Sequence, residues 1–109
     1  MHKIAAKRSE RVFPAAIALQ IVADGQNGSG QYAEARRTAE KALTIARDTA
    51  PNDGVLSRFY CTLADACFGE GDNAAARAAA DECVRLCEVA FGAEDEATVD
   101  ARRFAEKFR

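Results

Sequence analysis

Four cysteines are the residues of this chain with the most obvious potential for chemistry, as metal ligands or as oxidisable thiols. Cys61, Cys67, Cys83 and Cys87 follow one another at intervals of six, sixteen and four positions. Structural zinc sites place their ligand pairs on short spacers in loops, whereas these four fall in segments predicted to be helical. Free cysteine often behaves as a small buried residue. We therefore predict no metal site and no cofactor.

Catalytic constellations are also missing from the sequence. His2 is the only histidine, which removes Ser-His and Cys-His pairs from consideration. The glycine-rich segment 25–30 lacks the Lys-Ser/Thr that ends a phosphate-binding loop, and no strand is predicted before it. The sequence therefore predicts no enzyme.

Charge and hydropathy argue against nucleic-acid-binding and membrane proteins. The chain has 109 residues and a formal net charge of −2, which gives no general attraction to nucleic acid or to anionic lipid. The segment 51–100 carries eleven acidic and three basic residues. No apolar run approaches the length of roughly 18 residues that suggests a membrane span. Because four cysteines occur without a recognisable secretion signal, we expect a reducing compartment, the cytoplasm.

Composition and glycine placement predict helices throughout. Alanine, the best helix former, occurs 25 times, and there are only two prolines. Pro14 favours a helix start close to it, so residues 1–12 are expected to be a frayed basic extension. Asp72 is expected to cap the fourth helix, and Asn52 or Asp53 the third. Asp95 or Glu94 places a negative charge at the start of the fifth, where it suits the helix dipole. The predicted helices cover about residues 13–27, 31–50, 55–69, 72–91 and 95–108.

The sequence repeats itself without a gap when position 28 is aligned with position 69, a 41-residue period. Residues 28–36 (GSGQYAEAR) then align with residues 69–77 (GEGDNAAAR). Within each copy, small residues recur at steps of three and four, which marks one face of a helix. In the first copy these are Ala35, Ala39, Ala42 and Ala46, and in the second Ala76, Ala80, Cys83 and Cys87. Each copy should be a tight antiparallel helix pair.

These residues resemble the tetratricopeptide repeat. The resemblance rests on Leu63-Ala64, Gly71-Asp72, Ala76 and Cys83 in the second copy, and on Val22-Ala23, Gly30, Tyr32, Ala35 and Ala42 in the first. The usual period is about 34 residues, so the longer period found here is similar to that of the kinesin light chain type. Phe91-Gly92-Ala93-Glu94-Asp95 resembles the connecting segment of such repeats. The resemblance implies an all-α, right-handed solenoid with repeats at about 13–53 and 54–94 and a terminal helix at about 95–108.

The family further implies that the first helix of each pair lines a concave groove. On that face we place Ile17, Gln20, Ile21, Asp24, Arg58, Cys61, Thr62, Asp65, Phe68, Val99, Arg102, Arg103 and Glu106. Asp24, Asp65 and Glu106 are aligned by the repeat and form an acidic ladder. Arg58, Arg102 and Arg103 lie beside it. These charges either pair among themselves or recognise a charged partner peptide. In the second case Phe68 would be an apolar anchor for that peptide.

One departure from the family limits this inference. Gln20-Ile21, Cys61-Thr62 and Arg102-Arg103 stand where peptide-binding members often carry asparagines, so their peptide-backbone clamp is not transferred. Cys61 aligns with polar Gln20 and Arg102, which makes it the thiol expected to be accessible.

The function implied is a protein- or peptide-binding adaptor without catalysis. Stacked repeats usually need about three units, and this chain has about two and a half. The alternative is therefore a structural or regulatory subunit that stacks its end surfaces, as a homodimer or as part of a longer array.

Overall fold

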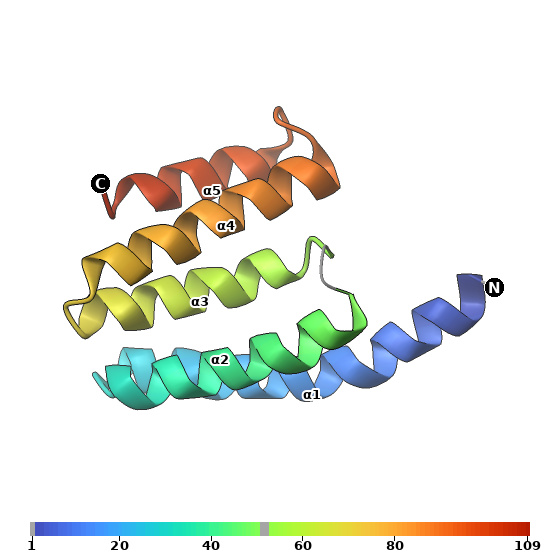
Figure 1. Ribbon diagram of the computed structural model, residues 1–109, viewed down its shortest axis with the longest axis horizontal. Helices are drawn as coiled ribbons and strands as arrows, with labels where there is room; N and C mark the ends of the chain where they lie inside the picture. Colours follow the sequence, from blue (N-terminus) through green and yellow to red (C-terminus); the bar gives the residue numbers. More distant parts are fainter. Residues whose placement is uncertain (1, 51–52) are drawn as a thin grey trace.

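Five α-helices follow one another in the part of the chain that the structure describes, and each packs against the next (Figure 1). The computed structural model describes residues 2–50 and 53–109, and the side chains from residue 14 onward except that of residue 49. The helices are α1 (His2–Gly28), α2 (Tyr32–Thr49), α3 (Leu56–Gly69), α4 (Asn73–Phe91) and α5 (Glu96–Glu106). The all-α prediction of sequential antiparallel helix pairs is confirmed.

The turns that close the two helix pairs have the same backbone hydrogen bonds at aligned positions of the repeat. Gln31 N–H donates to the Gln26 carbonyl at 2.8 Å, and Asp72 N–H donates to the Cys67 carbonyl at 2.9 Å. The residue before each donor is a glycine with positive φ, 81° at Gly30 and 88° at position 71. A left-handed glycine with this six-to-one bond is the Schellman ending of a helix. The sequence repeat is therefore also a repeat of backbone geometry.

The small residues on α2 and α4 form the buried seam that the repeat predicted. The four alanines of α2 are at most 1% exposed, and their counterparts on α4 are at most 3% exposed. Small side chains let α2 approach α1, and α4 approach α3, closely. Between the pairs, Leu56 and Phe59 of α3 meet Leu43 of α2 and Leu86 of α4 in one core.

The predicted cap of α4 is present, and α5 is capped by Asp95, one of the two acidic residues expected near its start. Asp72 accepts a hydrogen bond from the Ala75 N–H at 3.1 Å, and Asp95 accepts one from the Ala97 N–H at 2.9 Å. Each carboxylate satisfies an N–H group that the first helical turn leaves without a helical partner.

The start of α1 differs from the prediction. Helix α1 begins at His2, and Pro14 lies inside it. Proline removes one helical hydrogen bond but does not forbid the helix. The segment 2–12 is rich in alanine, lysine and arginine, which favour the helical conformation on both sides of Pro14.

Helix α5 and the turn that follows it close the far edge of the fold. Phe108 is 4% exposed, and its ring meets those of Phe68 and Phe104 edge-on, with centroids 5.4 and 5.1 Å away. Its carbonyl accepts a hydrogen bond from Arg77 Nε of α4 at 3.2 Å. These contacts attach α5 to both α3 and α4.

Candidate functional site

Two of the predicted groove residues lie between α1 and α3. Gln20 and Thr62 are 6% and 4% exposed. Gln20 Nε2 donates to Thr62 Oγ1 at 3.3 Å and to Asp24 Oδ2 at 3.1 Å, and the Thr62 hydroxyl donates to Asp24 Oδ1 at 2.8 Å. The expectation that Gln20 and Thr62 face a partner is therefore wrong. They are buried because α1 and α3 pack directly on each other, and the bonds join the two helices.

The charges on this face pair differently from the expected ladder. Lys107, which directly follows α5, lies 3.7 Å from Asp65, whereas Arg102 pairs with Glu88 of α4 at 2.9 Å. Arg102 also donates to the Ala93 carbonyl at 3.0 Å. Burial raises the pKa of Asp65, and Lys107 opposes that shift. Arg102 is thus turned towards α4 and away from the acidic side chains expected beside it.

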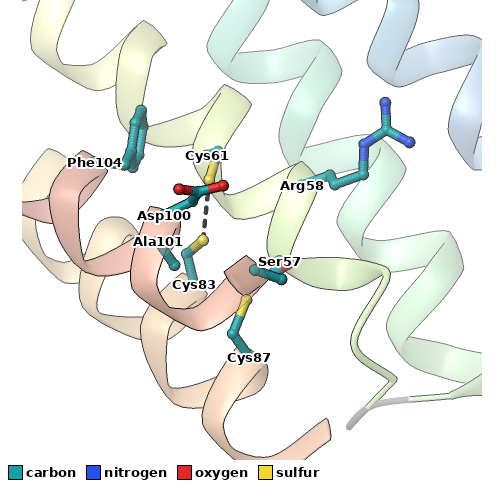
Figure 2. A pocket seen from close by; sticks show the side chains of 9 residues that line it. Ser57, Arg58, Cys61, Cys83, Cys87, Asp100, Ala101 and Phe104 are labelled. Atoms are coloured by element: carbon teal, nitrogen blue, oxygen red, sulfur yellow. Dashed lines mark hydrogen bonds between the residues drawn. The ribbon is translucent and has the colours of Figure 1, made fainter. Parts of the chain in front are cut away.

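An apolar pocket of about 310 Å³ opens between α3 and α5 (Figure 2). We call it the α3–α5 pocket. Arg58 and Asp100 are exposed residues at its edge. Its remaining lining comes from α3, from α5 and from the side of α4 beneath them, and consists of Ser57, Cys61, Cys83, Cys87, Ala97, Ala101 and Phe104. Of the predicted groove residues, only Arg58 and Cys61 line this pocket.

A small side chain on α5 explains why space remains there. Ala101 stands where the repeat alignment has Leu19 in α1 and Tyr60 in α3. Both of those larger side chains are half-buried and pack against the core. The short side chain of Ala101 leaves comparable space empty between α3 and α5. The sequence therefore indicates this pocket, because the side chain at this aligned position is much smaller in α5 than in α1 and α3.

Three of the four cysteines meet in the α3–α5 pocket. Cys61 is half-buried, Cys83 is 2% exposed, and their Sγ atoms lie 2.9 Å apart (Figure 2). The hydrogen-bonding contact with Cys61, together with burial, raises the pKa of Cys83. Burial raises the pKa of Cys87, and Ser57 opposes that shift. Among the described side chains, those of residues 14–48, 50 and 53–109, no cluster of three or more Cys, His, Asp or Glu residues is arranged to hold a metal ion.

A second pocket of about 310 Å³ lies at the turn end of α1 and α3. Asp65 and Phe68, both predicted groove residues, line it together with Asn27 and Tyr32. Asn27 Nδ2 donates to the Thr62 carbonyl at 3.2 Å. The Phe68 side chain is 51% exposed, as an apolar anchor for a partner would need to be.

The remaining predicted residues line neither pocket. Ile17 packs against the core, and Ile21 is 64% exposed on α1. Val99 is half-buried. Glu106 and Arg103 are exposed, and Arg103 reaches Asp100 of its own helix at 4.0 Å. The predicted face thus contains several local environments, among them parts of the two pockets described above.

Comparison with known proteins gives one match. The sequence model of the tetratricopeptide repeat matches residues 57–89, which cover nearly all of α3 and most of α4. No curated protein and no solved structure matches the chain. Over the described part of the chain, none of the helices combines the length and apolar character needed to cross a bilayer. Residues 57–89, in the second helix pair, thus match the tetratricopeptide repeat, and this pair is set in an all-α array of sequentially packed antiparallel helices.

Proposed function

We propose that this chain is a protein- or peptide-binding module without catalysis, and that the α3–α5 pocket receives a side chain of the partner. The observation that carries the proposal is the apolar pocket between the first helix of the repeat and the helix that follows the pair. A concave site with an apolar lining and a few polar groups at its edge is the usual form of a binding site. The tetratricopeptide match at 57–89 supports an interaction role.

The pocket's dimensions and edge suggest the chemistry of the partner. A volume of about 310 Å³ is at the small end of ligand sites, so it suits one or two apolar side chains of a peptide. Arg58 and Asp100 at the edge can pair with charges that flank those side chains. Paired charges at an exposed edge contribute selectivity and association rate more than affinity. Phe68, on the same face of α3, offers a second apolar contact.

We further propose that both helix pairs belong to the longer type of repeat, similar to that of kinesin light chains. The turn hydrogen bonds recur at Gln31 and Asp72, aligned positions of the two copies, and α2 and α4 have 18 and 19 residues. The period is seven positions longer than that of the usual repeat, which corresponds to about two additional helical turns.

The experiment is a selection of peptides from a random library on the immobilised chain, followed by calorimetry on selected sequences. Ala101→Leu fills the pocket with the side chain that the aligned position 19 carries, and Arg58→Glu reverses the charge at its edge. We expect each change to weaken binding at least tenfold, which corresponds to about 1.4 kcal/mol.

Matched controls carry the same chemical changes away from the pocket. Ala33→Leu and Arg37→Glu alter exposed positions on α2 and should leave affinity unchanged. Peptides that bind all four variants equally would refute the pocket as the binding site. Sedimentation velocity of the wild-type chain tests the alternative, because end-to-end stacking predicts a dimer or a larger assembly.

A further inference from the structure

We propose that Cys61 and Cys83 are a redox modification site, at which a peroxide converts the two thiols into a reversible disulfide between α3 and α4. The bond requires no partner protein, so this inference does not depend on the proposed binding function. It rests on the contact between the two sulfur atoms and on their position at the α3–α5 pocket.

The distance between the sulfur atoms is suitable for this reaction. They lie 2.9 Å apart, within about 1 Å of the length of a disulfide bond. They come from two helices that already pack against each other, so small side-chain rotations can bring them together. Figure 2 shows the contact between the two sulfur atoms beside Asp100 and Ala101 of α5, at the pocket.

The other thiols are less suitable partners. Cys83 and Cys87 are four residues apart on α4, where Cβ atoms are about 5–6 Å apart. A disulfide needs about 3.5–4.5 Å between its Cβ atoms. Cys67 lies in a different cluster, packed against Ala76 and Phe108. The geometry therefore selects the pair formed by Cys61 and Cys83.

Exposure assigns the two roles. Cys61 is half-buried and lines the pocket, so a small oxidant reaches it first, whereas Cys83 is almost completely buried. The contact with Cys61 and burial raise the pKa of Cys83, which keeps this thiol protonated before oxidation. Cys61 is thus the thiol that reacts with peroxide, and Cys83 resolves the product.

The reaction balances with hydrogen peroxide as the oxidant. The Cys61 sulfur attacks one peroxide oxygen, an S–O bond forms, the O–O bond breaks, and one water leaves with the thiol proton. The Cys83 sulfur then attacks the Cys61 sulfur, an S–S bond forms, and the S–O bond breaks. The departing hydroxide takes the Cys83 proton as a second water. Two thiols are oxidised, and one peroxide is reduced to two waters.

The fold itself does not require sulfur at these positions. The first repeat has Gln20 where the second has Cys61, and Ala42 where the second has Cys83. Ala42 is fully buried in the same seam, so alanine fills that position adequately. This makes Cys83→Ala a variant that should fold, and Cys87→Ala is its matched control because Ala46 is its counterpart.

The test treats the full chain with one equivalent of hydrogen peroxide, blocks the remaining thiols under denaturing conditions, and identifies tryptic peptides by mass spectrometry. Cleavage by trypsin after arginine yields peptide 59–77 with Cys61 and Cys67, peptide 78–85 with Cys83, and peptide 86–102 with Cys87. We expect loss of two of the four thiols and a link between 59–77 and 78–85 that a dithiol reductant removes.

Variants assign the bond. The link should persist in Cys67→Ala and Cys87→Ala and disappear in Cys61→Ser and Cys83→Ala. Four free thiols after treatment would overturn the proposal, as would oxidation that stops at the sulfenic or sulfinic acid of Cys61. A link that involves Cys67 or Cys87, or that joins two chains, would overturn it too.

Discussion

The Thr62 hydroxyl of α3 donates a 2.8 Å hydrogen bond to Oδ1 of Asp24 on α1, 38 residues earlier in the chain. Gln20 Nε2 donates to both of these side chains, at 3.3 and 3.1 Å. This polar group, in which Gln20 and Thr62 are buried and Asp24 is exposed, joins the first helices of the two pairs, in the layer where we expect a partner from the sequence alone. Its role is to hold the helix pairs in register.

Replacement of Thr62 by valine should therefore destabilise the fold. Valine keeps the shape of threonine but removes the hydroxyl, which leaves Gln20 and Asp24 each without one hydrogen bond. The expected loss is about 1–2 kcal/mol in the free energy of unfolding, measured by urea denaturation.

Thr44→Val is the matched control, because its exposed hydroxyl bonds only to the Glu40 carbonyl of its own helix. The control should change stability by less than about 0.5 kcal/mol. Equal effects at the two positions would contradict the role assigned to the contact between α1 and α3.

The two glycines that end α1 and α3 provide a second prediction. They are aligned by the repeat, but a Cβ at Gly69 would collide with the ring of Tyr32, whereas a Cβ at Gly28 would meet no atom within 4 Å. Gly69→Ala should lower the free energy of unfolding by about 1–3 kcal/mol through overpacking. Gly28→Ala should be neutral or stabilising by up to about 1 kcal/mol, because alanine favours the helix.

Thermal melts followed by circular dichroism compare the two variants. The expected order of melting temperatures places Gly28→Ala at or above the wild type and Gly69→Ala below it. The reverse order would show that the contact between Tyr32 and the end of α3 does not limit the packing of the two pairs.

Asp72 predicts a dependence of stability on pH. The hydrogen bond from the Ala75 N–H and the ion pair with Arg36 at 3.1 Å lower the pKa of this carboxyl in the folded chain. Its stabilising contribution is therefore complete above the unfolded pKa of about 4 and is lost as the pH falls through the lower folded value.

The measurement compares wild type with Asp72→Asn, which keeps a side-chain oxygen at the cap but does not titrate. Chemical denaturation should show the wild type more stable than the variant at pH 6, with a smaller difference at pH 3. A difference that stays constant between these two pH values would contradict the assignment.

The sequence alone determined the helical architecture. The internal repeat, the glycines at positions 30 and 71, and the alanine stripes are local patterns, and each has a local physical cause in backbone conformation or helical periodicity. Helix order, the seam and the cap at Asp72 follow directly from these patterns. The helical start at His2 does not, because Pro14 predicts a later start, whereas the alanine, lysine and arginine residues before it favour the helix.

The tertiary structure decided which side chains on those helices are available. Periodicity identifies a face of one helix, but it does not say how closely the next helix approaches that face. Where α1 and α3 are in contact, the side chains of Gln20 and Thr62 form a hydrogen bond with each other between the helices. Where α3 and α5 stand apart over Ala101, a pocket remains, and Cys61 meets Cys83 beside it. The distance between two neighbouring helices depends on the volumes of side chains from three helices at once. These side chains come together only in the packed fold.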